Sequence, residues 1–156
     1  MMNKKRLFLY IPLFLALMLG STGCSSDESS VEIVEKDDSN DNPTLYYSIW
    51  RCYGFGNILN SEITIIQPAD NDCYNLVFYP DFHLTGTSSS NELYGEYQIE
   101  NRDISIVGLG GTKIGEINDG YDYVDALRDV EYYEMDNHQL KLFYNRGQNF
   151  LIYYRI

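Results

Sequence analysis

Few side chains of this chain could perform chemistry. Only two histidines, His83 and His138, are available as general bases, and each lies in a polar, turn-like stretch. The serine run at residues 88–90 lacks the Gly-x-Ser-x-Gly pattern that positions a nucleophile. Catalysis needs a base within hydrogen-bond reach of its target, so we predict that the chain is not an enzyme and has no catalytic residues. A glycosidase that uses a pair of carboxylates remains an alternative, because residues 44–156 contain 16 acidic side chains and the sequence does not give their separation.

Metal, phosphate and cofactor sites are not indicated either. No Cys-x-x-Cys or paired His spacing accompanies Cys52 and Cys73, which argues against zinc. Residues 108–113 are glycine-rich, but the spacing before Lys113 is too short for a phosphate loop and Ile114 replaces the magnesium-binding Ser or Thr. We therefore expect a flexible β-loop at residues 108–113, with neither a cofactor nor a metal.

Cys52 and Cys73 form an even pair in a chain that we predict below to be exported. They lie 21 residues apart, near the end of one predicted strand and the start of another. Such a pair favours a disulfide, with two buried thiols in a reducing setting as the alternative. A bridge closing this loop would stabilise the fold by roughly 3 kcal/mol.

The net charge of the chain indicates which classes of partner it can bind. The whole chain has 11 Lys and Arg against 23 Asp and Glu, a formal charge of −12. Residues 44–156 alone contain 16 acids and 7 bases, a formal charge of −9. Affinity for nucleic acid comes from cationic contacts to phosphates, so we predict no nucleic-acid partner.

Residues 1–23 have the pattern of a lipoprotein signal peptide. Basic residues at 4–6 precede an apolar run over residues 7–19, shorter than the about 20 residues that a membrane-spanning helix needs. The small residues before Cys24 resemble a lipobox, with Ser21 where Leu is usual. We predict that Cys24 is the lipid attachment site, with ordinary signal-peptidase cleavage as the alternative.

Residues 24–43 form an acidic segment after this signal. It contains seven acids, one Lys and almost no large apolar residue, which predicts a disordered tether. Acidic residues just after Cys24 resemble a tag for export to the outer face of the outer membrane. The sequence therefore predicts an outer-membrane lipoprotein of a Gram-negative envelope, at the cell surface in preference to the periplasmic face.

Residues 44–156 are predicted to form one mainly β domain. Alternation of apolar and polar residues indicates hairpins around 101–103 and 136–138, and the last three strands form a meander. The remaining strand candidates lie upstream, at residues 46–53, 63–66, 74–79 and 83–85.

One stretch departs from this alternation. Residues 121–129 have apolar side chains at the spacing of a short helix. We expect about eight short antiparallel strands and one short helix, closed as a small β-barrel-like sheet because a sheet of this size must protect its edges.

Part of this domain carries a resemblance to a known family. The residues that carry it are Ser90-Asn91, the Gly95–Ile99 strand with its Gly-x-Tyr, Ile104-Ser105-Ile106, Gly111-Thr112-Lys113, Leu127, Val130, Tyr133, Leu140 and Leu142. In this order they resemble the META domain of HslJ-type heat-shock lipoproteins, over residues 78–156. The resemblance implies a small β-barrel-like fold in the bacterial envelope, often lipid-anchored, with no established catalytic residues. Ile114-Gly115-Glu116 stands where the family usually has Met-x-Cys.

The predicted function follows from the membrane signal and the aromatic residues. We predict a non-enzymatic, lipid-anchored cell-envelope protein that is a structural or protein-binding module, held to the membrane by its N-terminal lipid. The alternative is a surface glycan-binding module that uses exposed Tyr or Trp50. Adjacent tyrosines at 46–47, 132–133 and 153–154 must each place one ring on either face of a strand, which leaves some rings exposed for either role.

Overall fold

The structure of the protein is a computed structural model that describes residues 44–156. The predicted signal peptide, the lipidation site Cys24 and the acidic tether lie outside the described residues. Within residues 44–156, no helix is both long and apolar enough to cross a membrane.

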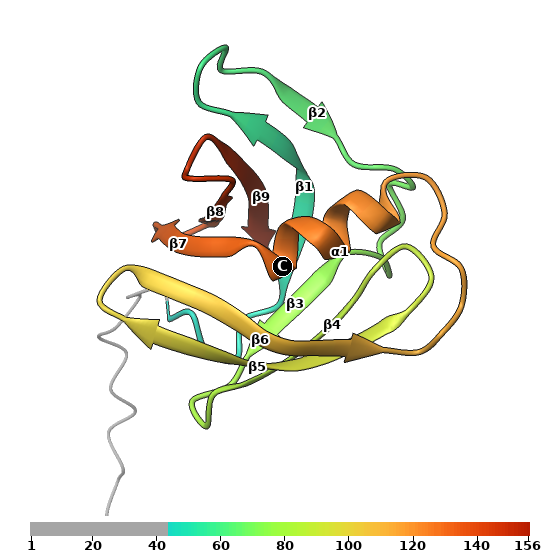
Figure 1. The fold of residues 1–156 in the computed structure, drawn as a ribbon, viewed down its shortest axis with the longest axis horizontal. Helices are drawn as coiled ribbons and strands as arrows, with labels where there is room; N and C mark the ends of the chain where they lie inside the picture. Colours follow the sequence, from blue (N-terminus) through green and yellow to red (C-terminus); the bar gives the residue numbers. More distant parts are fainter. Residues whose placement is uncertain (1–43) are drawn as a thin grey trace, which may run out of the picture. The chain divides into compact units, whose positions relative to one another are not determined.

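The domain is mainly β, as predicted, with nine antiparallel strands in one sheet and a single short helix among the described residues (Figure 1). The elements are β1 (Trp50–Asn57), β2 (Ile63–Ile65), β3 (Asn75–Phe78), β4 (His83–Thr87), β5 (Glu92–Glu100), β6 (Asp103–Gly111), α1 (Gly120–Arg128), β7 (Val130–Met135), β8 (Gln139–Tyr144) and β9 (Asn149–Arg155).

The strand ladder closes on itself. From β3 to β9, each strand pairs with the next along the chain. β1 pairs with β3 on one edge and with β9 on the other, which completes a barrel-like ring. β2 pairs with β1 beyond the end of β3 and has no second strand partner within residues 44–156, so it lies outside the ring.

The first strand begins later than the sequence predicted. We expected it over residues 46–53, but β1 starts at Trp50 because the backbone at Tyr47 has a positive φ of 59°, which ends extended structure there. The Ser48 hydroxyl donates to the carbonyl of Thr44, 3.0 Å away, and holds this segment as a turn. β1 then continues through Gly54 and Gly56, past the predicted end.

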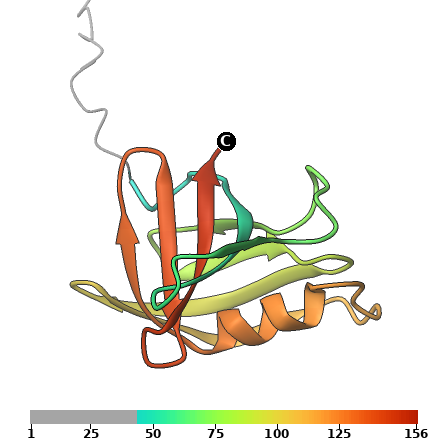
Figure 2. The same ribbon diagram turned by 90° about the horizontal axis from the view of Figure 1, so that it is seen from above.

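Helix α1 lies where the strand pairing of the ring is shortest. β6 and β7 share one paired position, Asp103 with Tyr132. α1 connects these two strands and packs against β6 and β8. Figure 2 shows α1 running beside the β5–β6 hairpin, while the β7–β9 meander stands across it. The predicted helix at residues 121–129 is confirmed to within one residue at each end.

The core is built from inward-facing side chains of the ring and one face of the helix. Tyr123 and Leu127 of α1 are fully buried, and the hydroxyls of Tyr123 and Tyr153 lie 3.2 Å apart. Trp50 is also fully buried, with its Nε1 donating to the carbonyl of Leu45 at 3.1 Å. The pair at 153–154 divides as predicted, since Tyr153 is buried and Tyr154 is 40% exposed.

The glycine-rich run at residues 108–113 is not the loop that we expected. Its first four residues belong to β6, opposite β5. A Cβ on Gly111 would lie 2.4 Å from the carbonyl oxygen of Glu92, so glycine is required there by strand packing. The glycines therefore allow close approach of two strands.

Candidate functional site

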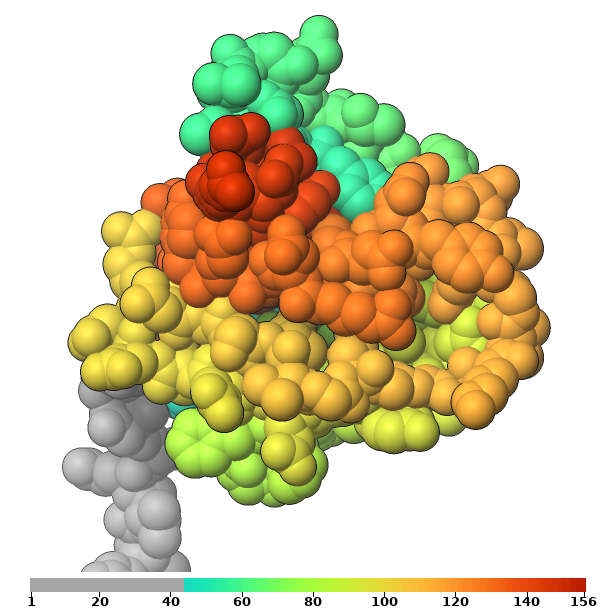
Figure 3. All heavy atoms as spheres, in the orientation of Figure 1, coloured from blue at the N-terminus to red at the C-terminus, as the bar shows by residue number. Residues whose placement is uncertain are grey.

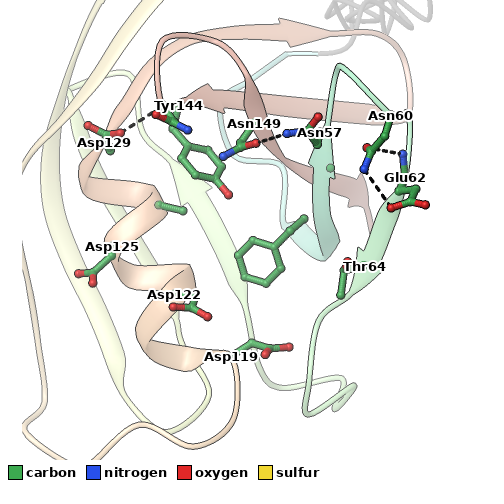
Figure 4. Close-up of a pocket in the computed structure, with 14 residues that line it drawn as sticks. Asn57, Asn60, Glu62, Thr64, Asp119, Asp122, Asp125, Asp129, Tyr144 and Asn149 are labelled. Atoms are coloured by element: carbon green, nitrogen blue, oxygen red, sulfur yellow. Dashed lines mark hydrogen bonds between the residues drawn. The ribbon is translucent and has the colours of Figure 1, made fainter.

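A groove of about 680 Å³ opens between α1 and the β1–β2 hairpin. Figure 3 shows the face of the molecule on which these elements meet, and Figure 4 shows the side chains that line the groove. The lining residues are Phe55, Gly56, Asn57, Asn60, Glu62, Thr64, Asp119, Asp122, Asp125, Ala126, Asp129, Tyr144, Asn145 and Asn149. Five of them are acidic and none is basic.

The helical wall of the groove follows from residue spacing on α1. Asp122, Asp125 and Asp129 recur every three or four residues, so they share one face of the helix. The opposite face is buried in the core through Tyr123 and Leu127. Packing of the apolar face therefore leaves these carboxylates on the exposed side of α1. In Figure 4, Asp122 points toward the groove, whereas Asp125 points away from it and forms an ion pair with Arg128 at 3.0 Å.

Two of the acids are held by backbone contacts. A carboxylate oxygen of Asp119 accepts a hydrogen bond from the backbone N–H of Gln67 at 2.8 Å. Asp129, at the end of the helix, accepts one from the backbone N–H of Asn145 at 3.1 Å. These contacts tie both ends of the acidic wall to neighbouring loops.

The opposite wall is ordered by amide side chains. Asn57 Nδ2 donates to Oδ1 of Asn149 at 2.6 Å, which joins β1 to β9. Asn60 accepts from the backbone N–H of Glu62 at 3.1 Å and donates to its carboxylate at 2.9 Å. The β1–β2 turn and the Glu62 carboxylate are therefore positioned before any ligand arrives.

Glycine is required where β1 passes the groove. A Cβ on Gly56 would lie 2.1 Å from the ring of Phe150, its partner on β9, which packs with Phe143 and Ile152 and does not line the groove. Only glycine fits at this crossing of strand and ring. Phe55, beside it, is half-buried and adds an aromatic surface to the groove.

A second cluster, the Glu116 network, fixes the segment that leads into α1. The Glu116 carboxylate accepts hydrogen bonds from Ser88 Oγ, Ser89 Oγ and Asn91 Nδ2 at 2.5 to 2.8 Å. Burial acts to raise the pKa of Glu116, but the donors Ser89, Ser88 and Asn91 outweigh it and hold that pKa below its ordinary value.

The same network orders the loop after β6. Asn91 Oδ1 accepts from the backbone N–H of Ile114 and from Thr112 Oγ1, each at 2.8 Å. Residues 88–91 form the loop between β4 and β5, and this loop clamps residues 112–117. Sequence reasoning missed this clamp; its only signal was an acidic residue within a largely apolar and glycine stretch.

The residues singled out from the sequence lie apart from the groove. Neither His83 nor His138 lines it. The imidazole of His83 lies 3.4 Å from the Asp81 carboxylate on an exposed turn. Among residues 44–156, no group of three or more His, Cys, Asp or Glu side chains is arranged to hold a metal ion.

The structure does not contain the predicted disulfide. Cys52 and Cys73 are both free thiols. The buried Sγ of Cys52 donates to the carbonyl of Gly54 at 3.7 Å, whereas the Sγ of Cys73 donates to that of Ser89 at 3.5 Å. The two sulfurs thus donate to different carbonyls. Their backbones are nevertheless close, since the backbone N–H of Cys52 donates to the carbonyl of Tyr74, the residue after Cys73.

Fold and groove together define a closed antiparallel β domain with an acidic, aromatic-floored groove. No family model matches the chain, and no curated protein matches its sequence. Solved structures do share the fold. One is a DUF4847 family protein from Bacteroides vulgatus, 17% identical with a TM-score of 0.53, covering 68% of this chain and 90% of its own.

A second similar structure comes from Burkholderia xenovorans. It was determined by NMR and is 21% identical with a TM-score of 0.57, covering 85% of this chain and 99% of its own. At this level of identity, both similarities concern the fold alone.

Proposed function

We propose that this chain is a non-enzymatic envelope protein, anchored by a lipid on Cys24, whose acidic groove binds a basic segment of another protein. The observation that carries the proposal is the composition of the groove wall, with five carboxylates and no Lys or Arg. A cleft lined by one sign of charge concentrates field lines and attracts ligands of the opposite charge. The predicted signal peptide and the resemblance to envelope lipoproteins support the proposed location.

The form of the groove supports a peptide better than a small ion. Its volume is about 680 Å³, within the range of clefts that hold several side chains. Phe55 and Tyr144 offer apolar and aromatic surface to the aliphatic stems of Lys or Arg, while the carboxylates face their charged ends.

Binding of fluorescent hepta-lysine to the full-length protein in detergent tests the proposal. Asp122→Asn with Asp125→Asn removes two groove charges and should weaken binding about fivefold, the effect of two partly exposed charge pairs. Glu96→Gln with Glu100→Gln removes two charges from exposed positions on β5 and should leave affinity nearly unchanged. Equal weakening by both double variants would mean that net charge, and not the groove, attracts the peptide.

A glycan ligand is the second candidate for the same groove. Asn57, Asn60 and Asn149 line it beside Tyr144, and amide groups next to an aromatic ring suit sugar hydroxyls and ring faces. Trp50, which we named for this role from the sequence, is fully buried and cannot contact a sugar. Salt-insensitive binding of a neutral oligosaccharide, lost on Tyr144→Ala, would favour this candidate over a basic peptide.

A further inference from the structure

The three-residue strand β2 is the open edge of the sheet. It pairs with β1 through Gly54 with Ile65, Phe55 with Thr64 and Gly56 with Ile63. Backbone hydrogen bonds at either end of this ladder run from Asn57 N to Glu62 O and from Ile66 N to Tyr53 O. Within residues 44–156, no strand pairs with the other side of β2.

The register fixes which backbone groups are left open. Residues 62, 64 and 66 of this segment direct their N–H and C=O groups toward β1, because hydrogen-bonded pairs alternate along an antiparallel ladder. The N–H and C=O groups of Ile63 and Ile65 therefore point away from β1. Such an edge is a template for pairing with another extended chain.

The two faces of β2 differ in chemistry. Thr64 and Glu62 line the acidic groove. Ile65 lines a cavity of about 250 Å³ on the other face, with Tyr53, Tyr154 and other residues that include Arg51 and Asp70. The rings of Tyr53 and Tyr154 meet edge to face, with centroids 5.7 Å apart. Side chains of a strand added beside β2 would point alternately to these two faces.

Charge decides which strand would fit. A strand that pairs with β2 places every second side chain beside Glu62 and the acidic groove, so those positions favour Lys or Arg. The chain's own residues 24–43 carry seven acids and one Lys, the wrong sign for this face. A second copy of the chain, with a formal charge of −12, is likewise disfavoured.

We propose that β2 is a docking edge for an extended protein segment in which basic and apolar residues alternate, paired to the backbone of Ile63 and Ile65 with its basic side chains on the groove face. This inference rests on the proposed function, because the groove supplies the charge. Beyond the proposed function, it states that the partner pairs with β2 through main-chain hydrogen bonds and that its basic residues recur at every second position.

The test compares two heptapeptides of the same composition on the full-length protein in detergent. One alternates Lys with Val, and the other has four Lys followed by three Val. The alternating peptide should bind about tenfold more tightly, because only it can pair with β2 and satisfy both faces. In amide hydrogen exchange followed by NMR, it should slow the exchange of the Ile63 and Ile65 N–H groups.

A pair of variants isolates the backbone contact. Ile65→Pro removes an outward N–H, which an edge strand tolerates, and should abolish the preference for the alternating peptide. Ile65→Ala removes the side chain and keeps the N–H, so the preference should remain in part. The exchange measurement on the wild-type protein decides the matter independently if the proline variant fails to fold.

The outcomes separate this inference from the proposed function. The docking edge would be overturned if both peptides bound equally well, if Asp122→Asn with Asp125→Asn weakened their binding, and if the Ile63 and Ile65 N–H groups were not protected. That result would leave the proposed binding of a basic segment in the groove intact. Failure of every basic peptide to bind would overturn both. A dimer in sedimentation that Ile65→Pro dissociates would also overturn the docking edge, because a second copy would then occupy β2.

Discussion

Replacing Glu116 by alanine is expected to destabilise the domain by about 2–4 kcal/mol. The carboxylate accepts from Ser88, Ser89 and Asn91, all of which are buried and would lose an acceptor. A hydrogen bond to a charged group contributes about 1.5–3 kcal/mol, and the total is discounted because Glu116 is partly exposed and water can replace part of the contact.

The pH dependence of this effect has a definite direction. The folded-state pKa of Glu116 is lowered, so its stabilisation is fully present above the unfolded value near pH ~4.3 and is lost as the pH falls through the folded pKa. The stability difference between wild type and Glu116→Gln should therefore be constant above about pH 5.5 and shrink below about pH 4.

Urea denaturation at several pH values, followed by tyrosine fluorescence and far-ultraviolet circular dichroism, measures both effects. Glu100→Ala is the control, because this glutamate is exposed at the end of β5. If Glu116→Ala loses no more stability than Glu100→Ala, or if the difference from Glu116→Gln grows on acidification, the reasoning is refuted. Because the network fixes the segment that leads into α1, Glu116→Ala should also weaken hepta-lysine binding.

Three further changes have distinct expected results. Cys24→Ala should abolish incorporation of radiolabelled palmitate and release the protein from membranes. Cys73 is only partly buried and should react with iodoacetamide in the native protein, slowly because burial and the nearby Asp70 and Asp72 raise its pKa. Cys52 is buried and should react only after unfolding; peptide mass spectrometry reads both. Gly56→Ala should cost about 1–3 kcal/mol in urea denaturation, because its Cβ would overlap the Phe150 ring.

Each of these changes has an outcome that would contradict it. Palmitate incorporation by Cys24→Ala would place the lipid elsewhere. A linked Cys52–Cys73 peptide without reduction would restore the disulfide that we predicted from the sequence. Gly115→Ala, where the nearest heavy atom to the new Cβ is 3.9 Å away, is the control for Gly56→Ala, and equal stability of the two variants would show that the Phe150 ring can move aside.

The fold could be predicted from local sequence because its signals are local. Alternation of apolar and polar residues predicted the strands of the β5–β6 and β7–β8 hairpins, and the spacing of apolar residues predicted α1. The start of β1 could not be read in this way. It depends on the backbone at Tyr47 and on burial of the Trp50 side chain against Leu45, both set by the closed sheet.

The groove needed the tertiary structure. The spacing of Asp122, Asp125 and Asp129 is visible in the sequence, but such a row is also typical of a solvated helix face. Only closure of the ring places this face opposite Glu62, 60 positions before Asp122 in the chain. The Glu116 network likewise joins residues 88–91 to residue 116, a pairing that the strands β5 and β6 bring about.

The strand pattern, the helix and the acidic charge could therefore be predicted from residue types alone, and the envelope location stays a prediction from the sequence. These properties depend on residue type and on neighbours within one turn or one hairpin. Only the folded domain shows that Trp50 is in the core, that Cys52 and Cys73 are free thiols, and that β2 has an unpaired edge within residues 44–156 beside an acidic groove. Those properties depend on which distant segments meet, and burial, hydrogen bonding and charge act between segments only after the sheet has closed.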